Sequence, residues 1–229
     1  TPSWWQTTVA SAGNLTSAVY RIFGKPFSEE GKKLFGVPFA QFLKLNSEFR
    51  YHYRIDKNQM IASRIAGGVI WSYGNATTAP YTEQFYIGGA NSVRAFSARS
   101  IGPGGYPPET DRKYTYINHV GDIRIEANIE YRFRMIADLH GAVFLDAGNV
   151  WLMRKDENRP NGEFTLKNFP KQIALGTGFG LRYDLDFLVF RLDLGIGLHD
   201  PYDTGKSGYY NIPKFKDSMA LHFAIGYPF

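Results

Sequence analysis

The stretch that decides the fold is "LKLNSEFRYHYRI", residues 43–55. Its odd positions, from Leu43 to Ile55, are mostly apolar or aromatic, and its even positions, from Lys44 to Arg54, are polar or charged. A two-residue period places alternate side chains on opposite faces of a β-strand. Because a usual strand has about five or six residues, this segment predicts a long strand with one apolar face and one charged face.

The same alternation returns along the rest of the chain and is just as clear in residues 123–135. The predicted strands, about eight in all, are residues 5–22, 43–55, 60–73, 123–135, 139–151, 175–185, 188–198 and 219–229. Short turns are predicted near residues 56–58, 136–138 and 184–187, and long links over residues 23–38, 75–119, 152–171 and 200–216. Short turns on one rim and long loops on the other are typical of a transmembrane, antiparallel, up-and-down β-barrel of the outer membrane.

The composition agrees with a membrane barrel and argues against several other classes. No window approaches the roughly 18 apolar residues of a membrane-spanning helix. The mean hydropathy of -0.30 is compatible with barrel strands, in which only every second side chain faces lipid. Without cysteine there is no disulfide framework and no thiolate metal site. The net charge of +5 is spread along the chain among acids, so we do not expect a nucleic-acid partner.

The alternation alone does not say which face is inside. A soluble, lipocalin-like barrel also has eight strands and would bury the apolar face around a ligand. Strand length, loop asymmetry and aromatic residues near the strand ends favour the membrane barrel. These aromatic residues are Tyr51, Tyr53, Trp71, Tyr73, Tyr131, Phe133, Tyr227 and Phe229. We therefore expect the apolar face to contact lipid and the charged face to line the lumen.

The predicted link of residues 75–119 is far longer than the roughly 12 to 15 residues beyond which a loop is usually functional or disordered. It contains "FYIGGANSVRAF", residues 85–96, in which apolar and aromatic side chains lie on both sides of Gly88 and Gly89, and Arg94 carries the single charge. Such a composition is unlike that of a disordered tail, so we expect the loop to fold back and pack against the rest of the molecule.

Four segments together resemble the BamA/TamA superfamily of outer-membrane assembly and translocation barrels, also called bacterial surface antigens. They are "YIGGANSVRAFSARSIGPGG" (86–105), "IEYRF" (129–133), "GAVFLDAGNVW" (141–151) and "FAIGYPF" (223–229). The resemblance implies a single barrel domain over residues 1–229 that corresponds to the C-terminal half of a sixteen-stranded barrel.

The chain begins at Thr1 without a methionine or a leader, and we expect a processed or excised product, with the missing strands and any periplasmic repeats upstream. Closure as a dimer of two halves is the alternative.

In that family the long extracellular loop carries a Val-Arg-Gly-Phe motif whose tip enters the lumen. The motif corresponds here to Val93, Arg94, Ala95 and Phe96. The alanine in place of glycine disfavours a left-handed backbone at this position. The resemblance also implies two acidic partners for Arg94, namely Glu130 and Asp146, and the alternation places both on the charged face. A guanidinium between two carboxylates can form bidentate hydrogen bonds; otherwise Arg94 rests without a fixed partner in a charged, wet lumen.

The resemblance implies an assembly or translocation factor in the bacterial outer membrane whose first and last strands meet weakly. The terminal strand would present Phe223, Ile225, Tyr227 and Phe229, and Pro228, which cannot donate to a ladder, suits such an edge. The implied partners are outer-membrane lipid, lipopolysaccharide, client outer-membrane or surface proteins, and a periplasmic or inner-membrane partner.

The sequence indicates neither an enzyme nor a cofactor. It contains no nucleophile elbow, P-loop or metal-spaced histidine cluster, and folding of the client would supply the free energy. Two other functions stay open: a dedicated polypeptide-secretion pore of the two-partner type, and a passive structural or channel barrel.

Overall fold

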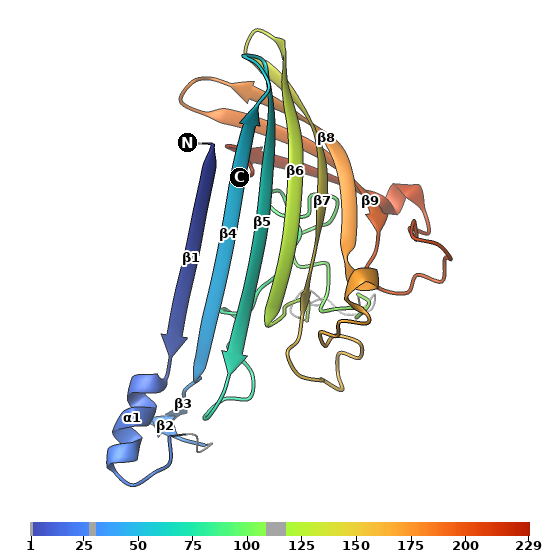
Figure 1. Ribbon diagram of the computed structural model, residues 1–229. Helices are drawn as coiled ribbons and strands as arrows, with labels where there is room; N and C mark the ends of the chain where they lie inside the picture. Colours follow the sequence, from blue (N-terminus) through green and yellow to red (C-terminus); the bar gives the residue numbers. More distant parts are fainter. Residues whose placement is uncertain (1, 28–30, 109–117) are drawn as a thin grey trace.

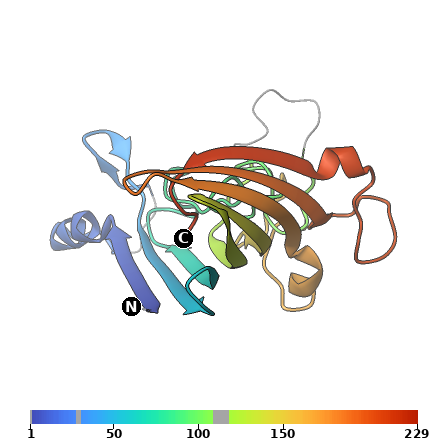
Figure 2. The ribbon, with the colours of Figure 1, turned by 90° about the horizontal axis from the view of Figure 1, so that it is seen from above.

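The computed structural model describes residues 2–27, 31–108 and 118–229. They contain one antiparallel sheet of eight strands in the order β1-β4-β5-β6-β7-β8-β9-β10. The strands are β1 (Ser3–Ala12), β4 (Phe42–Arg54), β5 (Gln59–Ser72), β6 (Ile123–Ile136), β7 (Leu139–Trp151), β8 (Ala174–Asp184), β9 (Val189–His199) and β10 (Met219–Ile225). The sheet curls into a trough (Figures 1 and 2). Within the described residues β1 and β10 do not pair with each other, so the strands form an open barrel wall with two free edges.

The connections alternate in length, as the sequence predicts. Short turns join β4 to β5, β6 to β7 and β8 to β9 at one end of the sheet, and the long links lie at the other end (Figure 1). The first long link contains α1 (Asn14–Ile22) and a small hairpin of β2 (Lys33–Leu34) and β3 (Val37–Pro38). No helix in the described parts of the chain is long and apolar enough to cross a membrane.

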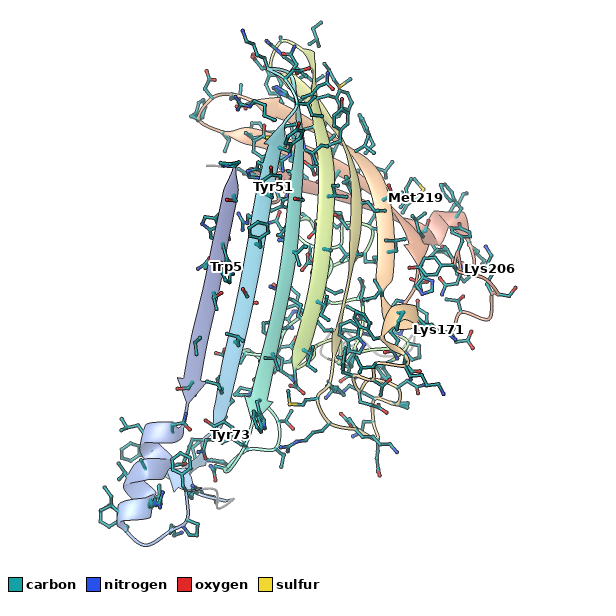
Figure 3. All side chains as sticks on the ribbon, in the orientation of Figure 1. Trp5, Tyr51, Tyr73, Lys171, Lys206 and Met219 are labelled. Atoms are coloured by element: carbon teal, nitrogen blue, oxygen red, sulfur yellow. The ribbon has the colours of Figure 1, made fainter. Side chains whose placement is uncertain are left out.

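The two faces of the sheet differ in the way that the alternation predicts. On the convex face, Trp5 of β1 is 73% exposed and Ile129 of β6 is 47% exposed. On the concave face, Glu130 and Asp146 are fully buried. Exposed apolar rows on the outside of a barrel wall are what lipid contact requires. Figure 3 shows Tyr51 near the short-turn end of the sheet and Tyr73 near the long-link end, as in aromatic girdles.

The structure corrects the first predicted strand, residues 5–22. The strand ends at Ala12, and Gly13 then adopts a left-handed backbone with φ of 73°. A Cβ at Gly13 would lie 2.3 Å from the carbonyl oxygen of Ala40, so this sharp bend requires glycine. The next apolar residues are spaced three or four apart, which is the period of a helix. They are Leu15, Val19 and Ile22 of α1.

The last predicted strand, residues 219–229, is also shorter in the structure. Strand β10 ends at Ile225 because Gly226 takes a φ of 83° and redirects the chain. Tyr227 and Phe229 therefore do not belong to the strand. The C-terminus lies inside the curl of the sheet (Figure 2), and Phe229 is buried there.

The hydrophobic core lies between the concave face and the link that connects β5 to β6. Of this link the structure describes residues 73–108 and 118–122, so part of the predicted loop 75–119 lies outside the described residues. The core side chains come from both the sheet and the link. They are Phe42, Ile70, Ala79, Phe85, Ile87, Val93, Ile101, Val150 and Ala174. The link is thus a packed part of the fold, and it carries the motif residues onto the concave face.

Candidate functional site

The tip of this link, residues 88–96, is folded into a compact turn that presents Arg94 to the sheet. Gly89 donates its N–H to the carbonyl of Phe96 at 2.8 Å, and Phe96 donates to the carbonyl of Val93 at 3.1 Å. Gly88 has a φ of 92°, and a Cβ there would meet the Ser97 carbonyl at 2.2 Å. A glycine is therefore needed where the turn closes. We call residues 88–96 the loop tip.

Arg94 contacts both of the acids that the family resemblance implies, Asp146 and Glu130. Its Nε donates to Asp146 Oδ2 at 2.8 Å and its Nη2 to Oδ1 at 2.9 Å, a bidentate pair. Its backbone N–H donates to the same Oδ2 at 3.0 Å. Its Nη1 donates to Glu130 Oε2. All three side chains are fully buried, so charge and hydrogen bonding together fix the position of the loop tip.

The pair belongs to a larger ion network on the concave face. Glu130 also accepts hydrogen bonds from Arg132 Nε at 2.6 Å and from Arg182 Nη2 at 3.0 Å. Arg182 Nη1 in turn donates to Asp193 Oδ1 at 2.6 Å. The network thus links β6, β7, β8 and β9. We use the name buried ion network for the following residues: Arg94, Glu130, Arg132, Asp146, Arg182, Arg191 and Asp193.

Aromatic rings close the network on two sides. The Arg94 guanidinium lies 3.6 Å from the centroid of the Phe144 ring, close enough for a cation–π contact. The C-terminal Phe229 ring lies 5.3 Å from the guanidinium of Arg64 and 5.6 Å from that of Arg132. Arg132 Nη2 also donates to the carbonyl of Phe229 at 3.3 Å. The chain end is therefore tied to the same network as the loop tip.

Glycines in β8 and β9 provide the space in which the loop tip sits. A Cβ on Gly195 would lie 2.2 Å from the carbonyl oxygen of Arg94, and a Cβ on Gly176 would lie 2.2 Å from the Cβ of Ala95. These contacts are closer than any side chain tolerates, so only glycine permits this approach of two backbones. Ala95 itself is not among the residues with positive φ, and the loop tip therefore does not need the family's glycine at this position.

Two side chains from the last strands reach the loop tip as well. Arg191 of β9 donates from Nη1 to the carbonyl of Ala90 at 2.9 Å. His222 of β10 lies with Nε2 at 2.9 Å from the carbonyl oxygen of Arg94. Because a carbonyl only accepts, the Nε2–H tautomer is assigned. The free-edge strand β10 is thus bonded directly to the loop tip.

The structure brings together some of the predicted residues and separates others. Val93, Arg94, Ala95 and Phe96 lie on the concave face with Glu130 and Asp146. Phe223 and Ile225 lie on the opposite face of β10, exposed by 68% and 61%. Tyr227 stacks over Arg132, with the guanidinium 4.5 Å from its ring centroid.

Sequence reasoning missed several residues of the site, although alternation had assigned most of them to the charged face of their strands. They are Arg132, Gly176, Arg182, Arg191, Asp193, Gly195 and His222. Their partners depend on strand register, which periodicity does not supply. Among the described residues, no three His, Cys, Asp or Glu side chains could hold a metal ion. The site can hold a loop and a strand in place, because its charged groups pair with one another and with the loop tip.

The open wall, with its apolar convex face and charged concave face, has the architecture of an outer-membrane β-barrel wall. The model of the Omp85 superfamily domain matches residues 33–229. The chain therefore belongs to the Omp85 superfamily, whose members are outer-membrane proteins, and its location is the bacterial outer membrane.

Two relatives and one solved structure are similar to this chain. The chain is 28% identical over 204 residues to the outer membrane protein assembly factor BamA of Nitratidesulfovibrio vulgaris, which covers 87% of the chain and 22% of the relative. It is 29% identical over 89 residues to BamA of Neisseria meningitidis serogroup B, covering 37% of the chain and 11% of the relative. The chain thus spans about a fifth of the first relative. The crystal structure of BamA from Haemophilus ducreyi lacking POTRA domains 1–3 shares the fold, with a TM-score of 0.55, 16% identity, and coverage of 81% of this chain and 35% of that one.

Proposed function

We propose that this protein inserts client proteins into the outer membrane, and that the buried ion network anchors the loop tip beside the free edge of β10 for this purpose. The observation that carries the proposal is the bond between the two elements: His222 of β10 reaches the carbonyl of Arg94, whose guanidinium is clamped by Asp146. An edge strand and an inserted loop thus share one set of contacts. The names of the relatives, both assembly factors, support the same role.

The free edge of β10 is the surface on which a client would act. Within the described residues only β9 pairs with β10, so one row of its N–H and C=O groups is available to another strand. Pairing through main-chain hydrogen bonds tolerates many client sequences, because side chains point away from the ladder. The exposed side chains of Phe223 and Ile225 face the lipid side of the same strand, so the partners are client strands and outer-membrane lipid. No catalytic step and no cofactor enter this proposal.

The experiment is depletion of the protein followed by quantitative profiling of the outer-membrane proteome, with complementation by variants. Wild-type protein should restore many outer-membrane proteins, and Arg94→Ala should fail to do so. The control is Arg134→Ala, which removes an exposed guanidinium that donates to the carbonyl of Ala137 in the short turn between β6 and β7, outside the network. Heat-modifiable migration in electrophoresis verifies that each variant forms its barrel.

The alternatives give different results in the same experiment. Loss of a single secreted protein, with the remaining proteome intact, identifies a dedicated secretion pore. An unchanged proteome identifies a passive structural or channel barrel. Restoration by Arg94→Ala as complete as by wild type would remove the proposed role of the loop anchor.

A further inference from the structure

The helix α1 is amphipathic, but its polar side faces the protein and its apolar side faces outward, the reverse of a helix on the surface of a soluble protein. Its polar residue Ser17 faces inward and is fully buried, with its hydroxyl donating to Gln41 Oε1 at 2.9 Å. Its apolar residues Leu15 and Ile22 face outward and are 82% and 81% exposed. A helix in water turns its apolar side to the protein and its polar side to the solvent. The surroundings of α1 are therefore expected to be apolar on its outer side.

A buried polar cluster holds this helix firmly in its inverted orientation. Lys32 is 1% exposed, and its Nζ donates to Ser17 Oγ at 3.1 Å and to the carbonyl of Phe27 at 2.6 Å. Tyr73, at the end of β5, donates its hydroxyl proton to Asn14 at the first turn of α1 at 2.8 Å. Rotating the helix to hide its apolar side would break these bonds, so the exposed apolar side chains are a fixed property of the fold.

The neighbouring hairpin extends the apolar surface. Phe35, at the turn between β2 and β3, is 97% exposed, and Val37 is 65% exposed. The helix and hairpin lie beyond the ends of β1 and β4, at the long-link end of the sheet (Figure 1). Val9 of the adjacent strand β1 is 65% exposed as well. Exposed apolar side chains gathered in one region of a protein mark an interaction site.

The charges around this surface identify its partner. Arg21, Lys25 and Lys33 are exposed. In the sequence, residues 13–40 carry four basic side chains (Arg21, Lys25, Lys32 and Lys33) against two acidic ones (Glu29 and Glu30), so the segment is net basic. An apolar face flanked by basic residues is the pattern of a helix that lies in the plane of an anionic membrane surface. We propose that residues 13–27 and 31–40 form a rim anchor, which inserts its apolar side chains into the lipid beside the barrel wall and binds phosphate-bearing headgroups through its basic ones.

The chain has no cysteine, so a single introduced thiol gives a clean test. An environment-sensitive fluorophore is attached to Ile22→Cys, in protein reconstituted into vesicles of phosphatidylcholine with or without phosphatidylglycerol. The matched control is Asn158→Cys, an exposed position in the link after β7 at the same end of the sheet. We expect the label at position 22 to be quenched by a lipid that carries a nitroxide near its headgroup and to be protected from iodide in water. The label at position 158 should show the reverse.

The charge part of the proposal has its own comparison. We expect the protection of the label at position 22 to be stronger in vesicles that contain phosphatidylglycerol. The double variant Arg21→Gln, Lys25→Gln should lose that difference while keeping the shallow insertion. A label at position 22 that iodide reaches freely would overturn the rim anchor. Protection from both quenchers would overturn it too, because a protein surface, from another segment or a second copy, would then cover the helix. A phosphatidylglycerol effect that survives the double variant would overturn the role of the basic residues.

Discussion

Replacement of Asp146 by asparagine is the sharpest perturbation of the loop anchor. Its Oδ2 accepts the Nε–H and the backbone N–H of Arg94 at 2.8 and 3.0 Å. Its Oδ1 accepts Nη2–H of Arg94 at 2.9 Å and Nδ2–H of Asn128 at 2.8 Å. An amide keeps one oxygen and turns the other position into a donor. Whichever way the amide is oriented, two donors lose their acceptor and face a third donor. One of the two carboxylate charges that balance Arg94 is also lost, and only that of Glu130 remains.

The magnitude follows from the burial of the pair. Breaking a fully buried ion pair by removing one partner costs about 3–5 kcal/mol. Since about 1.4 kcal/mol corresponds to a factor of ten in an equilibrium constant, the open state of the loop tip should become more populated by roughly two to three and a half orders of magnitude. Hydrogen exchange of peptides covering residues 88–96, which include the Arg94 amide, measures that population directly.

The control is Asp156→Asn. Asp156 accepts a hydrogen bond from Arg159 Nε at 2.8 Å, and this bond is the main reason why the pKa of Asp156 lies below its ordinary value. The pair is only partly buried and lies in a rim link outside the buried ion network, and ion pairs that water reaches contribute about 0–1 kcal/mol. Exchange in the loop tip should therefore match the wild type. Equal exchange at residues 88–96 in Asp146→Asn and wild type, with the sheet intact by circular dichroism, would refute the anchoring by this carboxylate.

Three further variants test the packing of the loop tip against β8 and β9 and its hydrogen bond to β10. Gly195→Ala places a Cβ 2.2 Å from the Arg94 carbonyl oxygen and should displace the loop tip, which protease cleavage within residues 88–96 would reveal. The control, Gly67→Ala, has its nearest neighbour at 3.8 Å and should be tolerated. Ala95→Gly should destabilise the docked loop tip by about 0.4–1 kcal/mol through chain entropy, a roughly two- to fivefold faster exchange; unchanged or slower exchange contradicts this. His222→Ala loses one hydrogen bond, about 0.5–1.5 kcal/mol, and should accelerate exchange in β10 and the loop tip together by about two- to tenfold. A change confined to β10 would mean that the two elements are not coupled.

The strands were predictable because alternation is a local property. The rows around Glu130 and Asp146 repeat over a dozen residues, and their parity alone assigns both acids to one face. The link of Arg94 to these acids came from the family resemblance. Which other residues join it depends on register: Arg182 stands opposite Arg191 across β8 and β9, and a slip of one residue would send one of them to the other face.

The two ends of the chain were harder to predict because single glycines decide them. Gly13 and Gly226 both take a positive φ, and no periodic pattern reports the conformation of one residue. After Gly13, an apolar spacing that fits a helix also fits, in part, the continuation of a strand. After Gly226, the destination of Phe229 depends on guanidinium groups from β5 and β6, which lie far away in the sequence.

The lengths of the strand pairings give the wall a gradient of mechanical strength. β4 and β5 are paired over thirteen positions, whereas β10 and β9 are paired over seven. Hydrogen-bonded and non-hydrogen-bonded pairs alternate along an antiparallel ladder, so the number of main-chain hydrogen bonds grows with the paired length. The ladder that retains β10 therefore has about half as many as the ladder between β4 and β5. Under tension from the lipid or from a neighbouring strand, the wall should peel from the β10 side. The hydrogen bond of His222 to the loop tip and the contact of the buried Phe229 with Arg132 would then set the force at which this separation begins.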